Sequence, residues 1–179
     1  AHDLVIGTHG RSLYKVNVEH LQQLDNNLMT GGAHIFDLNN ERYSDRWGKT
    51  SSWNKWYGYN EPKIRVPVFV ANAGMASIQL KTKKGTIVGE ENIELVKGLN
   101  YVDLSLELKE KYLQGYTKEL KKNKVEYGDK LKEKDNGKHY LLDGDYTISL
   151  SQEGETVSNS FQIEPPKEKP ERKPQKKTP

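Results

Sequence analysis

The sequence predicts a mostly β protein built on an antiparallel immunoglobulin-like β-sandwich. Short runs of alternating polar and apolar residues recur along the chain, with Gly, Asn, Asp and Pro between them. The runs do not alternate with helices as they would in a parallel sheet. Roughly six or seven such strands are typical of a sandwich. The chain has 179 residues, which is long enough to bury a core of this kind.

The N-terminal part, residues 1–40, predicts a β-hairpin followed by a linker helix. Residues 3–8 and 13–18 alternate on either side of a turn at residues 9–12. Val18, Leu21 and Leu24 recur at helical spacing, which predicts a short helix. The pairs at residues 26–27 and 31–32 predict a loop after it.

Residues 41–62 form a segment that we call the aromatic strap. It contains all 3 Trp of the chain and shows no regular period. Aromatic rings stack on the apolar faces of sugars, and nearby amides or guanidinium groups add hydrogen bonds. The strap is therefore the best candidate binding site, for a glycan or for contact between domains. Its candidate residues are Trp47, Trp53, Trp56, Tyr57, Tyr59, Arg46 and Asn54.

Residues 63–163 carry the sandwich pattern. We predict strands at residues 64–70, 76–82, 86–88, 92–96, 99–108, 145–151 and 156–163. Pro67 places the first of these at a sheet edge or a bulge. Two sets of apolar residues should face the core. They are Val102, Leu104, Leu106 and Leu108, and in the last hairpin Tyr146, Ile148, Leu150, Phe161 and Ile163.

Two segments depart from this pattern. Residues 107–138, the charged insertion, hold ten Lys against seven acidic residues and should be partly helical and largely solvated. Residues 164–179 hold five of the 7 Pro, with six basic residues against three acidic ones, and predict a disordered tail. The tail accounts for the formal net charge of +3. The body is thus neutral, which argues against nucleic-acid binding.

The composition also argues against catalysis by this chain. There are 0 Cys, which excludes disulfides, thiolate nucleophiles and cysteine zinc sites. The 5 His lack the i,i+4 spacing of a helical metal site. The acidic pairs at residues 90–91 and 107/110 fall in expected turns or solvated segments, outside a cleft. We therefore predict no catalytic residues, no metal and no cofactor. No apolar run approaches the ~20 residues of a membrane span.

The first hairpin, Asp3-Leu-Val-Ile-Gly-Thr-His-Gly-Arg-Ser-Leu-Tyr14, resembles the closing strands of bacterial BNR/Asp-box β-propeller proteins. The resemblance is to the sortilin-like group, often labelled glycosyl hydrolase or sialidase-like. Arg42, Tyr43, Trp47, Gly48 and residues 60–62 are similar to the strap through which that family leaves its propeller. Residues 144–150 are similar to the last hairpin of the sandwich that follows.

The resemblance implies an accessory module at the end of an exported propeller protein. Such a module would be non-catalytic, would brace its own propeller and would present a surface to a protein or glycan at the cell surface. A lone hairpin cannot bury both its faces, so these strands should pack either on a propeller or on the sandwich. Two alternatives stay open. The chain could belong to a glycoside hydrolase with its active site in the propeller, or it could be a carbohydrate-binding module.

Overall fold

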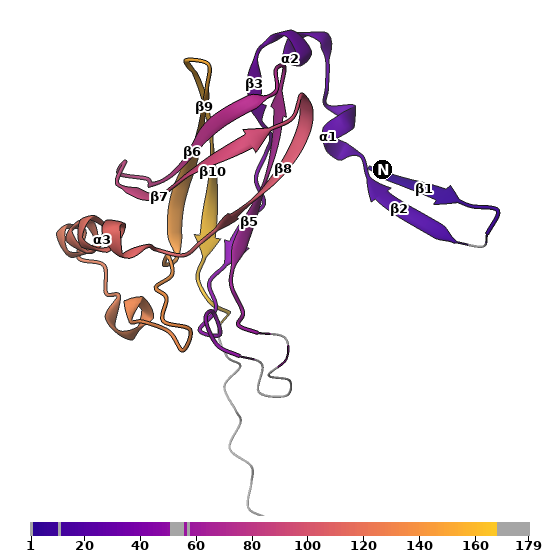
Figure 1. Cartoon of the computed structure of the whole chain (residues 1–179). Coiled ribbons are helices and arrows are strands. Elements are labelled where there is room, and N and C mark those ends of the chain that lie inside the picture. Colours follow the sequence, from indigo (N-terminus) through magenta and orange to yellow (C-terminus); the bar gives the residue numbers. More distant parts are fainter. Residues whose placement is uncertain (1, 11, 51–55, 57, 168–179) are drawn as a thin grey trace, which may run out of the picture.

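A computed structural model describes residues 2–10, 12–50, 56 and 58–167. Two sheets face each other across a shared hydrophobic core, and an N-terminal arm projects from them (Figure 1). The chain is mostly β, as the sequence predicts. Within the described part, no helix is both long and apolar enough to span a membrane.

The larger sheet has five strands in the order β4-β10-β9-β6-β7. These are β4 (Glu41–Arg42), β10 (Glu155–Glu164), β9 (Gly144–Gln152), β6 (Gly74–Thr82) and β7 (Ile87–Leu95). Neighbours are antiparallel except β4, which runs parallel to β10. The predicted β9–β10 hairpin is confirmed, and its five predicted core residues are all buried. Tyr146 and Phe161 stand opposite each other and stack at 5.7 Å.

The smaller sheet has the order β3-β5-β8, with β3 (Ala33–Ile35), β5 (Lys63–Val70) and β8 (Gly98–Ser105). The prediction that Pro67 marks an edge strand or bulge is wrong, because β5 is central. The Pro67 carbonyl accepts from the Phe36 N–H at 3.1 Å, just beyond the last β3 pair at Ile35. Phe36 continues the register opposite Pro67, so the missing Pro67 N–H removes the reciprocal bond to the Phe36 carbonyl, and Asn159 Nδ2 donates to that carbonyl instead at 3.1 Å.

Two other boundaries differ from the sequence prediction. The runs predicted at 86–88 and 92–96 form the single strand β7, since Glu90 and Glu91 pair with Gln79 and Ile78 of β6. The loop predicted after residue 25 is instead helix α2 (Asn26–Thr30), which Asp25 caps by accepting from the Leu28 N–H at 2.7 Å.

The charged insertion is partly helical, as predicted, and covers one end of the sandwich (Figure 1). It contains α3 (Glu110–Lys122) and the 3-10 helix η2 (Gly128–Leu131). Tyr116 of α3 is buried and joins a closed hydrogen-bond ring. The Leu142 N–H donates to the Tyr116 hydroxyl, which meets the Tyr146 hydroxyl at 2.8 Å, and Tyr146 donates back to the Leu142 carbonyl. Burial raises the pKa of both tyrosines, so the ring stays neutral.

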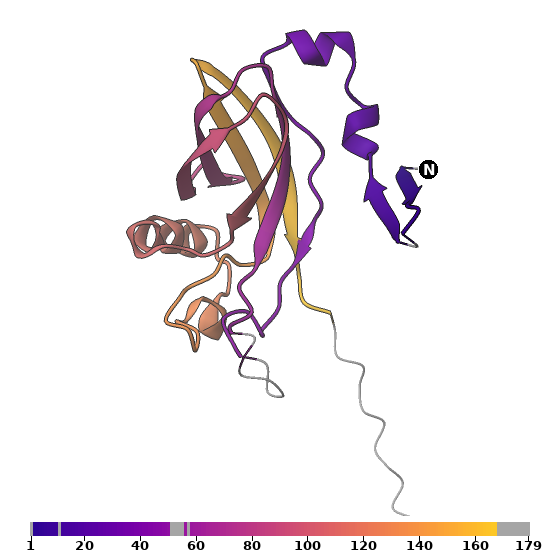
Figure 2. The same ribbon diagram turned by 45° about the vertical axis from the view of Figure 1, so that its right-hand side comes forward.

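The predicted N-terminal hairpin is also confirmed. It consists of β1 (Asp3–Gly7) and β2 (Leu13–Asn17), and α1 (Glu19–Gln22) and α2 connect it to β3. We call residues 2–30 the arm. The hairpin stands apart from both sheets (Figure 2). At the other end of the chain β10 ends at Glu164, and most of the predicted tail, from residue 168, lies outside the described residues.

Candidate interaction surfaces

The hairpin of the arm carries one entirely apolar face. Leu4 pairs with Val16, and Ile6 pairs with Tyr14. Residues directly opposite in an antiparallel ladder share a face, so these four side chains form one surface. We call it the apolar hairpin face. The other face is mixed and carries the ion pair between Lys15 and Asp3 at 2.9 Å.

The apolar hairpin face is open to solvent in the part of the chain described. Its four side chains are between 46% and 58% exposed, and every strand residue of the hairpin is classed as exposed. A two-stranded hairpin by itself is marginally stable in water. Contiguous exposed apolar side chains mark a site of interaction. The hairpin thus does not pack on the sandwich, which was one of the two arrangements that the sequence allowed.

The residues of the predicted aromatic site do not stay together in the structure, because one is buried and others are exposed. Trp47 is buried and packs edge-on against Tyr43 at 5.1 Å and Tyr140 at 6.2 Å. It belongs to the core, and burial raises the pKa of its neighbour Tyr43 to about 12. Trp56, by contrast, is 96% exposed, and Tyr59 is also exposed. Trp53, Asn54 and Tyr57 lie outside the described residues.

The base of the strap is closed by backbone bonds. The Gly48 N–H donates to the Asn60 carbonyl at 2.8 Å, and the Asn60 N–H donates to the Lys49 carbonyl at 3.0 Å. Arg46, predicted to contact a glycan or another domain, lines a hollow with Lys49, Thr50 and Asn60 at this base. Arg46 therefore lies at the base of the strap. Its neighbour Trp47 is buried in the core.

An ion-pair cluster ties the end of the strap to the charged insertion. The Lys138 ammonium lies 2.8 Å from Glu61 and 3.2 Å from Glu107. Hydrogen bonds to these carboxylates raise the pKa of Lys138, and the same contact to Lys138 lowers the pKa of Glu61. Because these groups are partly exposed, solvent screens the ion pairs and they add little to stability. We infer that they fix the end of the strap against the charged insertion.

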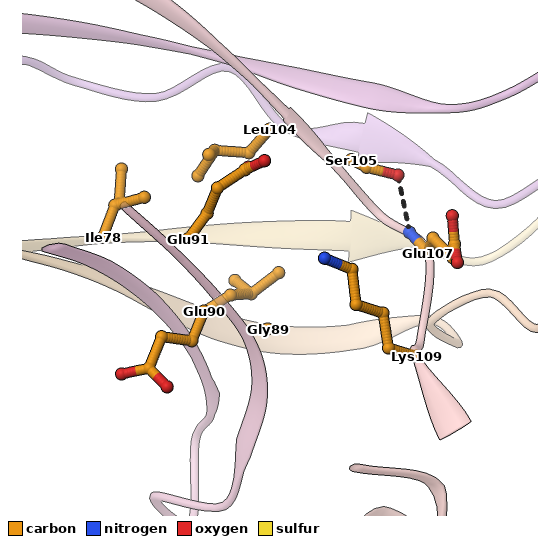
Figure 3. A pocket seen from close by; sticks show the side chains of 9 residues that line it. Ile78, Gly89, Glu90, Glu91, Leu104, Ser105, Glu107 and Lys109 are labelled. Atoms are coloured by element: carbon orange, nitrogen blue, oxygen red, sulfur yellow. Dashed lines mark hydrogen bonds between the residues drawn. The ribbon is translucent and has the colours of Figure 1, made fainter. Parts of the chain in front are cut away.

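An apolar slot opens between β7 and the chain that follows β8 (Figure 3). Its floor is Ile78, Leu80 and Leu104, and its volume is about 60 Å³. Glu91 lies on the inner face of β7 because it pairs with Ile78, whereas Glu90 lies on the outer face and accepts from Gln79 at 2.7 Å. Figure 3 accordingly shows the two carboxylates pointing in different directions. A slot this small is far below the roughly 300–1,000 Å³ of small-molecule sites.

The described residues contain no group of three or more His, Cys, Asp or Glu side chains placed to hold a metal ion. The sequence analysis did not single out the apolar hairpin face as a surface. The sequence pattern could have revealed this face. Apolar residues occupy every second position in both strands, and a short turn between the strands brings these positions opposite each other.

Comparisons with known proteins add little. No protein-family model matches the chain, and no curated protein does. Among solved structures, one match is a selenomethionine-labelled beta-glucosidase from Kluyveromyces marxianus, with 15% identity and a TM-score of 0.33. The match covers 74% of this chain and 14% of that protein. A score this low carries no argument about fold or activity, so a functional assignment depends on the surfaces described above.

Proposed function

We propose that this chain is a non-catalytic interaction module of an exported β-propeller protein, and that it braces the propeller through the apolar hairpin face. The observation that carries the proposal is the open apolar face formed by Leu4, Ile6, Tyr14 and Val16. The resemblance of residues 3–14 to closing propeller strands supports the choice of partner.

The hairpin has the chemistry to join another sheet. Among the described strands β1 and β2 pair only with each other, so each has an outer edge available for backbone pairing. Strand addition supplies main-chain hydrogen bonds, and burial of alternate side chains supplies specificity. The short helices α1 and α2 then hold the sandwich close to the propeller without merging the two cores.

The test uses a propeller of the resembled family that lacks its own last hairpin. The chain should bind it in isothermal titration calorimetry, and Ile6→Asp should weaken binding at least tenfold because the charge falls on the apolar hairpin face. Val5→Asp is the matched control, since Val5 lies next to Ile6 on the opposite, mixed face. Equal effects of the two substitutions, or no binding by the unmodified chain, would contradict the proposal.

A carbohydrate-binding role is the second candidate, favoured by the exposed ring of Trp56. A glycan array with the unmodified chain and Trp56→Ala examines it, with retained sandwich spectra as the folding control. An enzymatic role for this chain would require turnover of aryl-glycosides by the chain alone, which the proposed function does not predict.

A further inference from the structure

A second surface lies where the arm meets the sandwich. A cleft of about 470 Å³ separates α1 from the outer face of the three-stranded sheet. His20 of α1 spans it at one point, with Nδ1 at 3.2 Å from the Tyr101 hydroxyl and its ring 5.0 Å from that of Phe36. This contact holds α1 over the sheet and leaves a hollow beside it. We call this hollow the arm cleft.

The floor of the arm cleft is apolar and partly aromatic. Pro67 of β5 and Tyr101 of β8 stand opposite each other in the ladder, and Leu38 follows β3. Tyr101 is 50% exposed although it belongs to the middle of a strand. An open tyrosine ring beside aliphatic surface is suited to packing against the C–H face of a ring-shaped ligand.

The walls of the arm cleft are polar, and several of their side chains are not bonded to other described residues. The amides of Gln23 and Asn39 and the carboxylates of Glu19 and Asp37 line it. None of these four side chains makes a hydrogen bond or ion pair to another described residue. They therefore supply donors and acceptors on both sides of the floor, from the arm and from the chain after β3.

Charge in the arm cleft disfavours anions. Its one arginine, Arg65, donates to Asp103 through two bonds of 2.8 and 3.1 Å, so an acidic partner already compensates its charge. Glu19 and Asp37 have no such cation among the described residues. A phosphate, sulfate or uronic acid would meet two carboxylates that nothing offsets.

We propose that the arm cleft binds a neutral saccharide. The volume lies within the range of small-molecule sites, the tyrosine and proline offer a stacking surface, and the amides and carboxylates match vicinal hydroxyl groups. The site is separate from the apolar hairpin face and from the strap. It therefore does not depend on docking to a propeller, and either proposal can fail without the other.

The experiment is a screen of neutral oligosaccharides against the full chain by saturation-transfer NMR, followed by titration of the best one. Tyr101→Ala should weaken binding at least tenfold, and Gln23→Ala should weaken it several-fold. Tyr101→Phe keeps the ring but loses the hydroxyl contact with His20, so it should weaken binding less than Tyr101→Ala does. Met75→Ala is the control because Met75 is 63% exposed on β6, away from both the cleft and the strap. It should bind like the unmodified chain.

A second readout separates binding in the arm cleft from a loss of folding. Saturating sugar should slow amide exchange in α1, because this helix forms one wall, and leave exchange in the β9–β10 hairpin unchanged. The proposal is overturned if no neutral sugar binds, or if Tyr59→Ala or Trp56→Ala abolishes binding while Tyr101→Ala does not. Preference for an acidic glycan or for a lysine-rich peptide would also overturn it.

Discussion

Gly48 lies at the base of the strap, where the strap packs against the charged insertion. Its φ of +74° belongs to the left-handed region. A Cβ there would meet the Cβ of Lys134 at 2.5 Å, Oδ1 of Asn136 at 2.8 Å and Cε2 of Tyr140 at 2.9 Å. Gly58 has a similar φ of +68°, but a Cβ there would meet nothing within 4 Å. The two glycines thus separate backbone strain from steric crowding.

We expect Gly48→Ala to destabilise the protein far more than Gly58→Ala. The control should lose about 1–2 kcal/mol, which is the cost of a left-handed L-residue. Gly48→Ala adds overlap with three side chains in a packed region, which raises the loss by roughly 1–3 kcal/mol more. Urea denaturation monitored by tryptophan fluorescence measures both. Equal losses would show that the strap does not pack against the insertion as described.

At the scale of the elements, the two sides of the sandwich differ. On one side Asn159 of β10 donates to the carbonyls of Ile35 and Phe36 at 3.3 and 3.1 Å, which joins the larger sheet to the end of β3. On the other side β7 and β8 leave the small slot of Figure 3. The inward position of Glu91 on β7 is a common way to protect a sheet edge from pairing with other chains.

Replacement of Asn159 by alanine should loosen the side of the sandwich where β10 meets the end of β3. Two carbonyls lose their side-chain donor, and we expect a loss of about 1–3 kcal/mol in the free energy of unfolding. Amide exchange should quicken in β3 before it does in β9. The neighbouring Ser158→Ala removes an exposed hydroxyl with no hydrogen bond to other described residues and should change little. Uniform quickening over both sheets would contradict a local role for Asn159.

The elements that the sequence predicts best are those with strong local signals. The β9–β10 hairpin combines strict alternation with a Gly-containing turn, and its strands and core residues are as predicted. The misplaced strands depend on pairing with a neighbouring strand, which the pattern of a single run does not show. Gly89 and the adjacent acids interrupt the apolar pattern of β7, yet pairing with β6 keeps it extended. The neighbours of Pro67 could not be predicted, because where β3 ends is a tertiary property.

The candidate binding sites likewise depend on tertiary contacts that local sequence patterns do not show. Aromatic composition identified the strap, but only packing against Tyr43 and Tyr140 assigns Trp47 to the core and leaves Trp56 exposed. The arm cleft could not be predicted at all. Its residues come from α1, the segment after β3, β5 and β8, which are far apart in sequence and individually unremarkable.

At the scale of the whole molecule, the protein consists of a sandwich with a buried core and an arm that contributes no buried side chain to that core. None of the described residues before Ile35 belongs to the buried hydrophobic core. Stability should therefore reside in the two sheets and α3, whereas the apolar hairpin face is available for binding. Regions that bind partners commonly lie at the low-stability end of a structure.

Deletion of residues 1–17 tests this division. The free energy of unfolding of the sandwich should change by less than about 0.5 kcal/mol, as for surface changes, because no core contact is removed. Binding to the propeller should disappear. Ile148→Ala in the full chain provides the contrast, since loss of this buried side chain should cost about 2–5 kcal/mol and leave the hairpin intact. Thermal unfolding and calorimetry measure the two effects. If the deletion costs as much as Ile148→Ala, the hairpin is part of the folding unit, and a free docking element is the wrong description of it.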